Sequence, residues 1–197
     1  MLGALLGDGC LYRWKITNNY TILAGDNKFT TKYAARLSLC ISRKAKPYIN
    51  RSNNIWFVRA NNYALYSLFE RARNDIHYLQ NMVQEAGDVS SLLFVEGFFD
   101  AEGCVKIIKE KVRITPKICL DITNTNYEFL EIVRKILEEK LNIVARYSIQ
   151  KASPPKNRRV AYHLRIYKKE YVKRFFENIS TTKLGEEKTV LLNNWLR

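Results

Sequence analysis

The chain has 197 residues, which is long enough for one large domain or two small ones with a hydrophobic core. Its 33 Lys and Arg residues against 19 Asp and Glu residues give a formal net charge of +14, and aromatic residues make up 12% of the sequence. No apolar run is long enough to span a bilayer and no signal peptide stands out, so we expect an intracellular protein that does not cross a membrane.

The positive charge is shared between the two halves of the chain. Residues 1–88 contain 12 basic and 6 acidic side chains, and residues 89–197 contain 21 and 13. An excess in both halves, interleaved with aromatic residues, favours a nucleic-acid surface over a generally basic protein. A zinc site is not expected, and we expect reduced, buried cysteines, because no CxxC spacing and only two histidines accompany Cys10, Cys40, Cys104 and Cys119.

In chain order, the first half begins with an apolar segment over residues 1–9 and continues as strand pair, helix, strand pair and helix. Alternating apolar residues predict strands over 10–15, 20–24, 47–50 and 55–60. Apolar residues three and four apart predict one helix over 28–42 and another from about 63 to 69.

Residues 75–89 form the candidate connector, with a short helical piece over 78–83, and Ser90 or Ser91 is the expected N-cap of the next helix. The element order then repeats, with strands over 104–109, 117–123, 144–151 and 159–167 and helices over 127–141, 170–179 and 186–196. The additional residues of the second copy fall in turns, including 153–158. We therefore expect an α+β protein of two αββαββα half-domains, residues 1–88 and 89–197, each with an antiparallel sheet.

Each half opens on an apolar segment that ends in an acid followed by glycine: Met1–Gly9, MLGALLGDG, and Val95–Gly103, VEGFFDAEG. Small residues recur four positions apart in both segments, at Gly3 and Gly7 and at Gly97 and Ala101. Because residues four apart share one helix face, two such helices can pack closely through these residues, which would bring Asp8 and Glu102 together. The final glycine of each segment fits a helix stop in the left-handed conformation.

These segments resemble the two motifs of a LAGLIDADG homing endonuclease. The second copy has Gly97, Asp100, Ala101 and Gly103 in place, with Glu102 as the last acid. The first copy departs more, with Leu6 at the position of the first acid and Gly7 at that of the alanine. The resemblance covers nearly the whole chain and implies a monomer with the pseudo-twofold, duplicated LAGLIDADG fold and two saddle-shaped sheets.

Alternation along the strands assigns one face of each sheet to the helices and the other to DNA. In the second half, the helix-facing residues would be Val105, Ile107, Ile118, Leu120, Ile122, Val160, Tyr162, Leu164 and Ile166. The opposite face would contact DNA through Lys106, Lys117, Asp121, Arg146, Ser148, Gln150, Arg159, His163 and Arg165, and in the first half through Tyr12, Trp14, Arg51, Phe57 and Arg59. Such donors, acceptors and flat side chains suit base edges and phosphates, whereas a solvated sheet face is the alternative. The repeat places Arg59 and Arg165 at equivalent positions.

Asp8 and Glu102 are the candidate catalytic and metal-binding residues, because carboxylates hold Mg²⁺ at phosphodiesters, and we expect two or three divalent ions at these paired acids. Asp100 lies two residues, or about 200° of helix rotation, from Glu102, so it cannot face the same metal and is expected to be structural. The resemblance also implies a basic side chain near each scissile phosphate, for which Lys183 and Lys28 are the candidates.

The sequence therefore predicts a Mg²⁺-dependent endonuclease that cuts a long, nearly non-palindromic DNA duplex and, by the resemblance, serves intron homing from a free-standing, intron-encoded chain. The alternatives are an RNA maturase that binds intron RNA and a DNA-binding regulator on the same scaffold. Degenerate catalytic acids would favour those alternatives, and both acids are present here.

Overall fold

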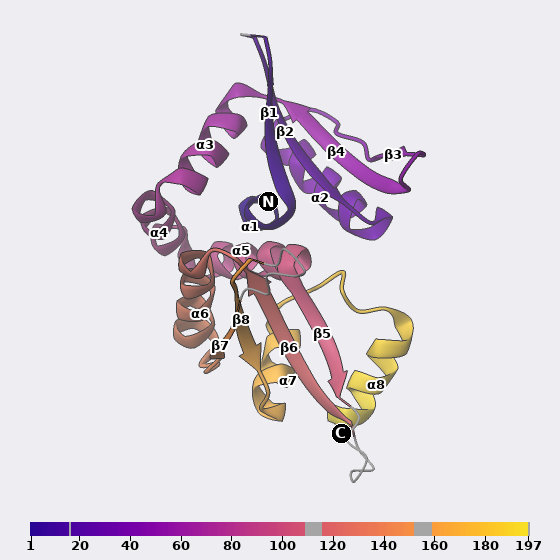
Figure 1. Cartoon of the computed structure of the whole chain (residues 1–197), viewed down its shortest axis with the longest axis vertical. Coiled ribbons are helices and arrows are strands. Elements are labelled where there is room, and N and C mark those ends of the chain that lie inside the picture. The colour runs from indigo at the N-terminus through magenta and orange to yellow at the C-terminus, as the bar shows by residue number, and fades with distance from the viewer. Residues whose placement is uncertain (16, 109–115, 152–158, 197) are drawn as a thin grey trace. The chain divides into compact units, whose positions relative to one another are not determined.

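The computed structural model of the chain describes residues 1–15, 17–108, 116–151 and 159–196. It divides into two compact units, Met1–Ala101 and Glu102–Arg197, here called unit 1 and unit 2. Each unit contains one four-stranded antiparallel sheet together with helices (Figure 1), so the expected α+β class with one sheet per half is confirmed. No helix of the described residues is both long enough and apolar enough to cross a bilayer.

Unit 1 has its strands in the order β1-β2-β4-β3. Its elements are α1 (Leu2–Asp8), β1 (Gly9–Trp14), β2 (Asn18–Gly25), α2 (Asn27–Cys40), β3 (Tyr48–Asn50), β4 (Ile55–Asn61), α3 (Tyr63–Asn74), α4 (Ile76–Glu85) and α5 (Gly87–Glu102). The boundary between these compact units falls after Ala101, because most of α5 packs within unit 1.

Unit 2 has the matching order β5-β6-β8-β7. Its elements are β5 (Gly103–Ile108), β6 (Lys117–Asn124), α6 (Tyr127–Leu141), β7 (Arg146–Gln150), β8 (Ala161–Ile166), α7 (Lys169–Asn178) and α8 (Glu186–Leu196). The expected strand residue Lys109 and the expected turn over 153–158 lie outside the described residues. Val160 was expected to face the helices, but this prediction is wrong, since Val160 precedes β8 and is 41% exposed.

Short polar side chains fix where four helices begin. The carboxylate of Asp26 accepts a hydrogen bond from the backbone N–H of Phe29 at 2.8 Å, and Asn62, Asp75 and Asn126 do the same for α3, α4 and α6. Each such cap stabilises a helix by about 1 kcal/mol. The expected cap at Ser90 or Ser91 is wrong, because α5 begins at Gly87 and the buried Ser91 hydroxyl donates to the Val83 and Gly87 carbonyls at 2.9 Å.

The two sheets have the same register. Gly9 pairs with Leu23 in unit 1, as Gly103 pairs with Ile122 in unit 2. One position back along the second strand of each sheet, Ile22 pairs with Arg59 and Asp121 pairs with Arg165. The duplication therefore extends to individual residue positions, and Arg59 and Arg165 occupy equivalent ones as predicted.

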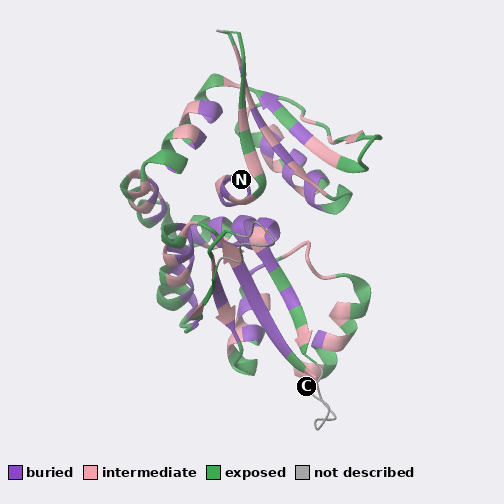
Figure 2. Ribbon diagram, viewed as in Figure 1, coloured by how far each residue is buried: buried purple, intermediate pink, exposed green. Residues whose placement is uncertain are grey.

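One face of each sheet carries the core. Leu23 and Val58 in unit 1, and Leu120, Ile122 and Leu164 in unit 2, are at most 1% exposed. Helices α2 and α3 pack on the sheet of unit 1, and α6, α7 and α8 pack on β6 in unit 2. Figure 2 shows that β6 is buried along most of its length. The buried residues of β6 therefore include some whose side chains point away from the helices.

The cysteines differ from expectation. Cys119 is buried, and burial raises the pKa of its thiol to about 11. Cys10, Cys40 and Cys104 are exposed instead of buried, although all four are free thiols. Cys10 and Cys104 directly follow the glycines that open β1 and β5, so strand alternation turns their side chains away from the helix-covered face.

In unit 1, α1 and α5 approach each other through glycine. A Cβ atom built on Gly3 would lie 2.0 Å from the Phe94 carbonyl oxygen, and one on Gly97 would lie 2.8 Å from the Ala4 nitrogen. Real Cβ contacts do not come this close, so these two positions accept only glycine at this helix separation. Gly7 is half-buried and Ala101 is buried.

Helix α5 also carries two buried acids that face α2 within unit 1. Asp100 is fully buried and accepts hydrogen bonds from the Tyr33 hydroxyl at 3.0 Å and from Lys32 Nζ at 2.6 Å. Glu96 pairs with Lys32 at 2.8 Å and with Arg36 at 2.5 Å. Burial, followed by the negative charge of Asp100, raises the pKa of Tyr33 above its usual value. Asp100 is thus part of the packing of α5 on α2.

We expect Lys32→Met to lower the free energy of unfolding by about 3 kcal/mol, because it removes the cation that both buried acids share and leaves their negative charge less compensated. The value lies at the lower end of the range for such pairs, since 20% of the Lys32 side chain stays exposed. Urea denaturation measures it. Lys28→Met, in the first turn of the same helix and exposed, is the control and should change stability by less than about 0.5 kcal/mol. Equal effects of the two substitutions would contradict the prediction.

Candidate nucleic-acid interface

The first motif acid, Asp8, is the last residue of α1 and is exposed. Gly9 follows it and opens β1, with φ −87° and ψ 150°. The expected left-handed conformation is therefore wrong for Gly9. Glycine is required for another reason: a Cβ atom at this position would lie 2.3 Å from the carbonyl oxygen of Leu5, so only glycine lets the strand leave this close to the preceding helical turn.

The second motif acid, Glu102, is the last residue of α5 and is half-buried. Its Oε1 atom accepts a hydrogen bond at 2.9 Å from the amide of Asn124, the last residue of β6. The side-chain oxygen Oδ1 of Asn124 in turn accepts from the backbone N–H of Asn126 at 2.7 Å, which fixes the orientation of the side-chain amide. The sequence analysis did not single out Asn124, because its role depends on this contact with the motif acid.

The two candidate basic residues lie in different units. Lys28 is exposed in the first turn of α2. Lys183 is half-buried in the segment that precedes α8, where its backbone N–H donates to the Thr181 hydroxyl at 3.1 Å. Their catalytic role stays a prediction.

A preformed cage for a metal ion is absent from the described residues, because none of their His, Cys, Asp and Glu side chains gather in groups of three or more. Asp8 and Glu102 each offer one carboxylate. Mg²⁺ is commonly held by one or two carboxylates together with substrate phosphates and water, so the oxygen chemistry of these residues fits the expected ion.

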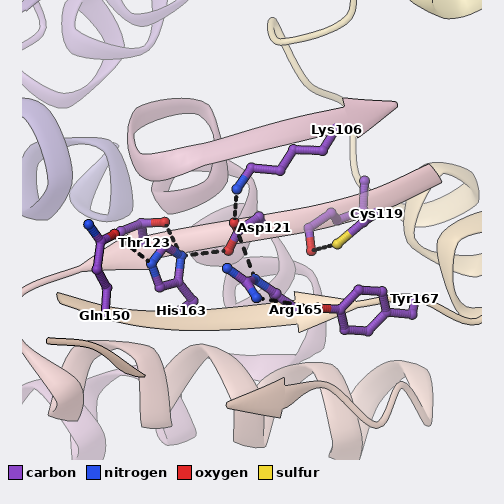
Figure 3. Close-up of polar contacts among 9 residues, drawn as sticks. Lys106, Cys119, Asp121, Thr123, Gln150, His163, Arg165 and Tyr167 are labelled. Carbon is purple, nitrogen blue, oxygen red and sulfur yellow. Dashed lines mark hydrogen bonds and ion pairs between the residues drawn. The ribbon is translucent and has the colours of Figure 1, made fainter. Parts of the chain in front are cut away.

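The polar face of the unit 2 sheet is held together by a buried carboxylate (Figure 3). Asp121 on β6 is 1% exposed and accepts hydrogen bonds from Lys106 on β5 and, at 3.0 Å, from His163 Nδ1 on β8. Arg165 Nε lies 3.4 Å from the same carboxylate. Burial alone would raise the pKa of Asp121, but the hydrogen bonds from Lys106 and His163 outweigh burial and keep this pKa below its usual value.

These surroundings differ from those expected of a residue that meets DNA directly. The Asp121 carboxylate has three partners inside the protein and almost no exposed surface. Its neighbours are more accessible: Lys106 and Arg165 expose 44% and 29% of their side chains, and Gln150, Lys117 and Arg146 are exposed. Asp121 therefore positions the basic side chains that surround it.

The equivalent face of unit 1 is aromatic. Tyr12 and Trp14 on β1 are 47% and 53% exposed, and their ring centroids are 6.3 Å apart. The Arg59 guanidinium lies over the rings of Tyr20 and Tyr48, 5.4 and 5.5 Å from their centroids. Phe57 stacks on Tyr48 at 5.7 Å. Arg59 thus lies on tyrosine rings where its counterpart Arg165 faces a carboxylate.

Two further DNA-contact candidates lie outside the strands. Arg51 is exposed in the turn between β3 and β4, and Arg159 is exposed before β8. Both are long, exposed basic side chains, a type that commonly contacts phosphates, and their role at DNA stays a prediction. Ser148 is half-buried on β7, paired with His163 on β8.

A cavity of about 770 Å³ opens at one end of the unit 2 sheet. Its lining combines four basic side chains with three tyrosines: Lys117, Arg146, Arg165, Lys168, Tyr147, Tyr167 and Tyr171. Positive charge beside flat rings is suited to sugar-phosphate and base surfaces. The cavity thus extends the basic face of unit 2 beyond the Asp121 cluster.

Known proteins resemble this chain in part of its sequence and in its fold. Residues 90–180 match the model of the LAGLIDADG-like domain. The structure of I-DmoI in complex with DNA and Mn is similar, with a TM-score of 0.60 and 22% identity over 90% of this chain and 92% of that one. The I-LtrWI LAGLIDADG homing endonuclease bound to target DNA has a TM-score of 0.54 and 12% identity over 99% and 94% of the two chains.

A third similar structure is the N-terminal LAGLIDADG domain of DUF199/WhiA, with a TM-score of 0.53 and 14% identity over 96% of this chain and 83% of that one. No curated protein sequence matches the chain significantly. At such low identity, the similarity of these structures shows a shared fold only. The chemistry of this chain depends on its own residues.

Proposed function

We propose that the chain, which has the two-motif LAGLIDADG fold and matches the LAGLIDADG-like domain over residues 90–180, is a site-specific endonuclease. It binds a long, nearly non-palindromic DNA duplex and hydrolyses both strands with divalent metal. The reaction serves intron homing, and the protein acts as a monomer because one chain supplies both motifs.

The observation that carries this proposal is the same in each unit. The motif acid is the last residue of a helix, and the next residue opens the first strand of the sheet: Asp8 precedes β1 and Glu102 precedes β5. The face of that sheet not covered by helices carries arginine, lysine and aromatic side chains. Each acid is thereby tied through one peptide bond to a surface suited to nucleic acid.

Different side chains at equivalent positions of the two sheets support a non-palindromic target. Gly9 is equivalent to Gly103, so Tyr12 and Lys106, each three residues further along the first strand, are equivalent. Arg59 is equivalent to Arg165, so Phe57 and His163, each two residues before the arginine, are equivalent too. Aromatic and charged side chains form different contacts with base edges, so the two sheets favour different half-sites.

Asp8 and Glu102 would hold the divalent ions, two or three in number, for which Mg²⁺ is our proposal. Metal bound at these carboxylates would offset charge on the phosphate and lower the pKa of the attacking water. The similar I-DmoI structure contains Mn, which supports a divalent cation. Asn124 holds the Glu102 carboxylate in one orientation, and Lys28 and Lys183 offset negative charge near the scissile phosphates.

The aromatic face of unit 1 gives a reason to keep RNA as the second candidate partner. Exposed, stacked rings such as Tyr12 and Trp14 bind unpaired bases, which folded intron RNA offers and an intact duplex does not. A maturase on this scaffold would therefore use the unit 1 face first.

A salt titration separates the two candidates. For the endonuclease, we expect the logarithm of the duplex affinity to fall with the logarithm of the salt concentration, with a slope of about −0.9 per neutralised phosphate.

Arg165→Ala should relax preference at particular base pairs by about 1–3 kcal/mol if Arg165 reads guanine, and weaken binding to all sequences alike if it binds phosphate. Tighter, cleavage-free binding to intron RNA, with no duplex sequence preferred, would favour the maturase instead.

A further inference from the structure

A line of hydrogen bonds crosses three strands on the polar face of unit 2 (Figure 3). It runs from Asp121 on β6 through His163 on β8 to Gln150 on β7. His163 Nδ1 lies 3.0 Å from Asp121 Oδ1 and 2.9 Å from the Thr123 hydroxyl, and His163 Nε2 lies 3.3 Å from Gln150 Oε1. Asp121 and His163 are buried, whereas Gln150 is exposed, so the line leads from the interior to the open face.

Both nitrogens of His163 face oxygen acceptors in this arrangement. A carboxylate accepts hydrogen bonds only, so Nδ1 must carry a proton toward Asp121. The side-chain oxygen of Gln150 also only accepts, so a hydrogen bond from Nε2 requires a proton on that nitrogen as well. Each ring nitrogen of His163 thus faces an oxygen acceptor, and the Asp121 carboxylate is the acceptor at Nδ1.

Other charged groups converge on the same carboxylate. Lys106 from β5 binds Asp121 Oδ2, and Arg165 from β8 lies 3.4 Å from that atom, so both cations engage the oxygen that His163 leaves open. Oδ1 is the oxygen nearest to His163. The division of the two oxygens lets one buried acid hold three basic side chains at fixed places.

The state of His163 decides which end of the Gln150 amide points outward. When Nε2 donates, the Gln150 oxygen turns inward and its NH₂ group faces the open side of the sheet. When Nε2 carries no proton it accepts, so the amide turns by 180° and presents its oxygen instead. An outward NH₂ group donates to guanine or thymine oxygens, and an outward oxygen accepts from the amino groups of adenine or cytosine.

We propose that His163, held by Asp121, is a specificity-determining positioning residue that fixes the polarity of Gln150 and thereby the base that Gln150 reads. The inference rests on the proposed function, because it assigns the unit 2 face to duplex DNA. It applies to unit 2 alone. At the equivalent positions of unit 1, Phe57 replaces His163, and Asn50 replaces Gln150 and is held by the Ser52 hydroxyl at 2.7 Å.

The test is the binding preference for duplexes in which each base pair of the target is varied in turn. In the parent chain we expect one base pair of the half-site bound by unit 2 to favour guanine or thymine over adenine or cytosine by about tenfold at the contacted position. Gln150→Ala identifies that base pair by removing its preference. Asp121→Asn should invert the preference toward adenine or cytosine, because a neutral Asn side chain no longer stabilises the imidazolium.

A second variant avoids the buried position. Gln150→Glu presents only acceptor oxygens, so it should give the inverted preference with Asp121 intact, and at an exposed site it leaves folding unaffected. Lys106→Met is the matched control: it removes another partner of Asp121 and should weaken binding to all sequences without inverting any preference.

A readout in the free protein is independent of DNA. The chain has only two histidines, so nitrogen NMR of the imidazoles can assign His163 directly. We expect protons on both of its nitrogens in the parent and on one in Asp121→Asn. A bare Nε2 in the parent, or a sequence preference that Gln150→Ala or Asp121→Asn leaves unchanged, would overturn the inference alone. A parent chain with no duplex preference at all would overturn the proposed function with it.

Discussion

Asp8→Asn and Glu102→Gln should each remove DNA cleavage while the protein still binds its target. Each substitution deletes a metal-binding negative charge and hardly changes side-chain size. Metal stabilisation of the transition state amounts to several kcal/mol, so the cleavage rate should fall by about a thousandfold or more. Single-turnover cleavage with Mg²⁺, together with electrophoretic binding, measures both effects.

A matched control separates catalysis from general charge loss. Asp88→Asn neutralises an exposed acid in the first turn of α5, at the end of that helix opposite to Glu102, and should leave the cleavage rate unchanged. Full double-strand cutting by Asp8→Asn or Glu102→Gln would refute the assignment of that residue. Loss of only one strand's cut would mean that each acid serves its own scissile phosphate.

The element order could be read from the sequence because local signals agree with the fold. The apolar periodicity of residues 127–141 and the cap at Asn126 both act within one helix, and the predicted helix has the same bounds as α6. The repeat also transferred information between halves. Once two segments were matched, the equivalence of Arg59 and Arg165 followed from counting residues, and the strand register bears it out.

Features that depend on packing could not be read in this way. A glycine after a helix commonly adopts the left-handed conformation, but Gly9 is extended because it opens β1 and pairs with Leu23. A serine before an apolar run usually caps a helix, but Ser91 lies inside α5, which starts four residues earlier. In both cases the local rule describes an isolated helix end, whereas here a strand begins directly at Gly9 and α5 extends further towards its N-terminus than the apolar run.

The role of Asp121 shows the same limit at the candidate site. Strand alternation placed Asp121 on the polar face, and its hydrogen-bond partners lie on that face. Alternation gives the direction of a side chain but not what covers it, so it could not show that Lys106, His163 and Arg165 close over the carboxylate. Ile22 at the equivalent position of unit 1 cannot gather cations, which leaves Arg59 to the tyrosine rings.

Gly3→Leu or Gly97→Leu should unfold unit 1 or strongly destabilise it. Even the first carbon of a side chain at Gly3 would lie 2.0 Å from the Phe94 carbonyl oxygen and 2.8 Å from the Phe98 nitrogen. These are backbone atoms of α5, so no side-chain rotation relieves the clash and the two helices must separate. Overpacking of a core commonly lowers the free energy of unfolding by about 1–3 kcal/mol. Because the clash is with rigid backbone, we expect both substitutions to cost about 3 kcal/mol or more, at the upper end of that range or beyond it.

Thermal melts of alanine variants give the sharper test, since alanine adds only the Cβ atom. Gly3→Ala should lower the melting temperature of unit 1 by roughly 10 °C, at about 2–4 °C per kcal/mol for a chain of this size. Gly185→Ala is the control, because a Cβ atom there would have no heavy atom within 4 Å and the backbone needs no positive φ. Melting of Gly3→Ala within a degree or two of Gly185→Ala would mean that α1 and α5 do not meet at Gly3. The close packing that fixes Asp8 at the start of the unit 1 sheet would then need another explanation.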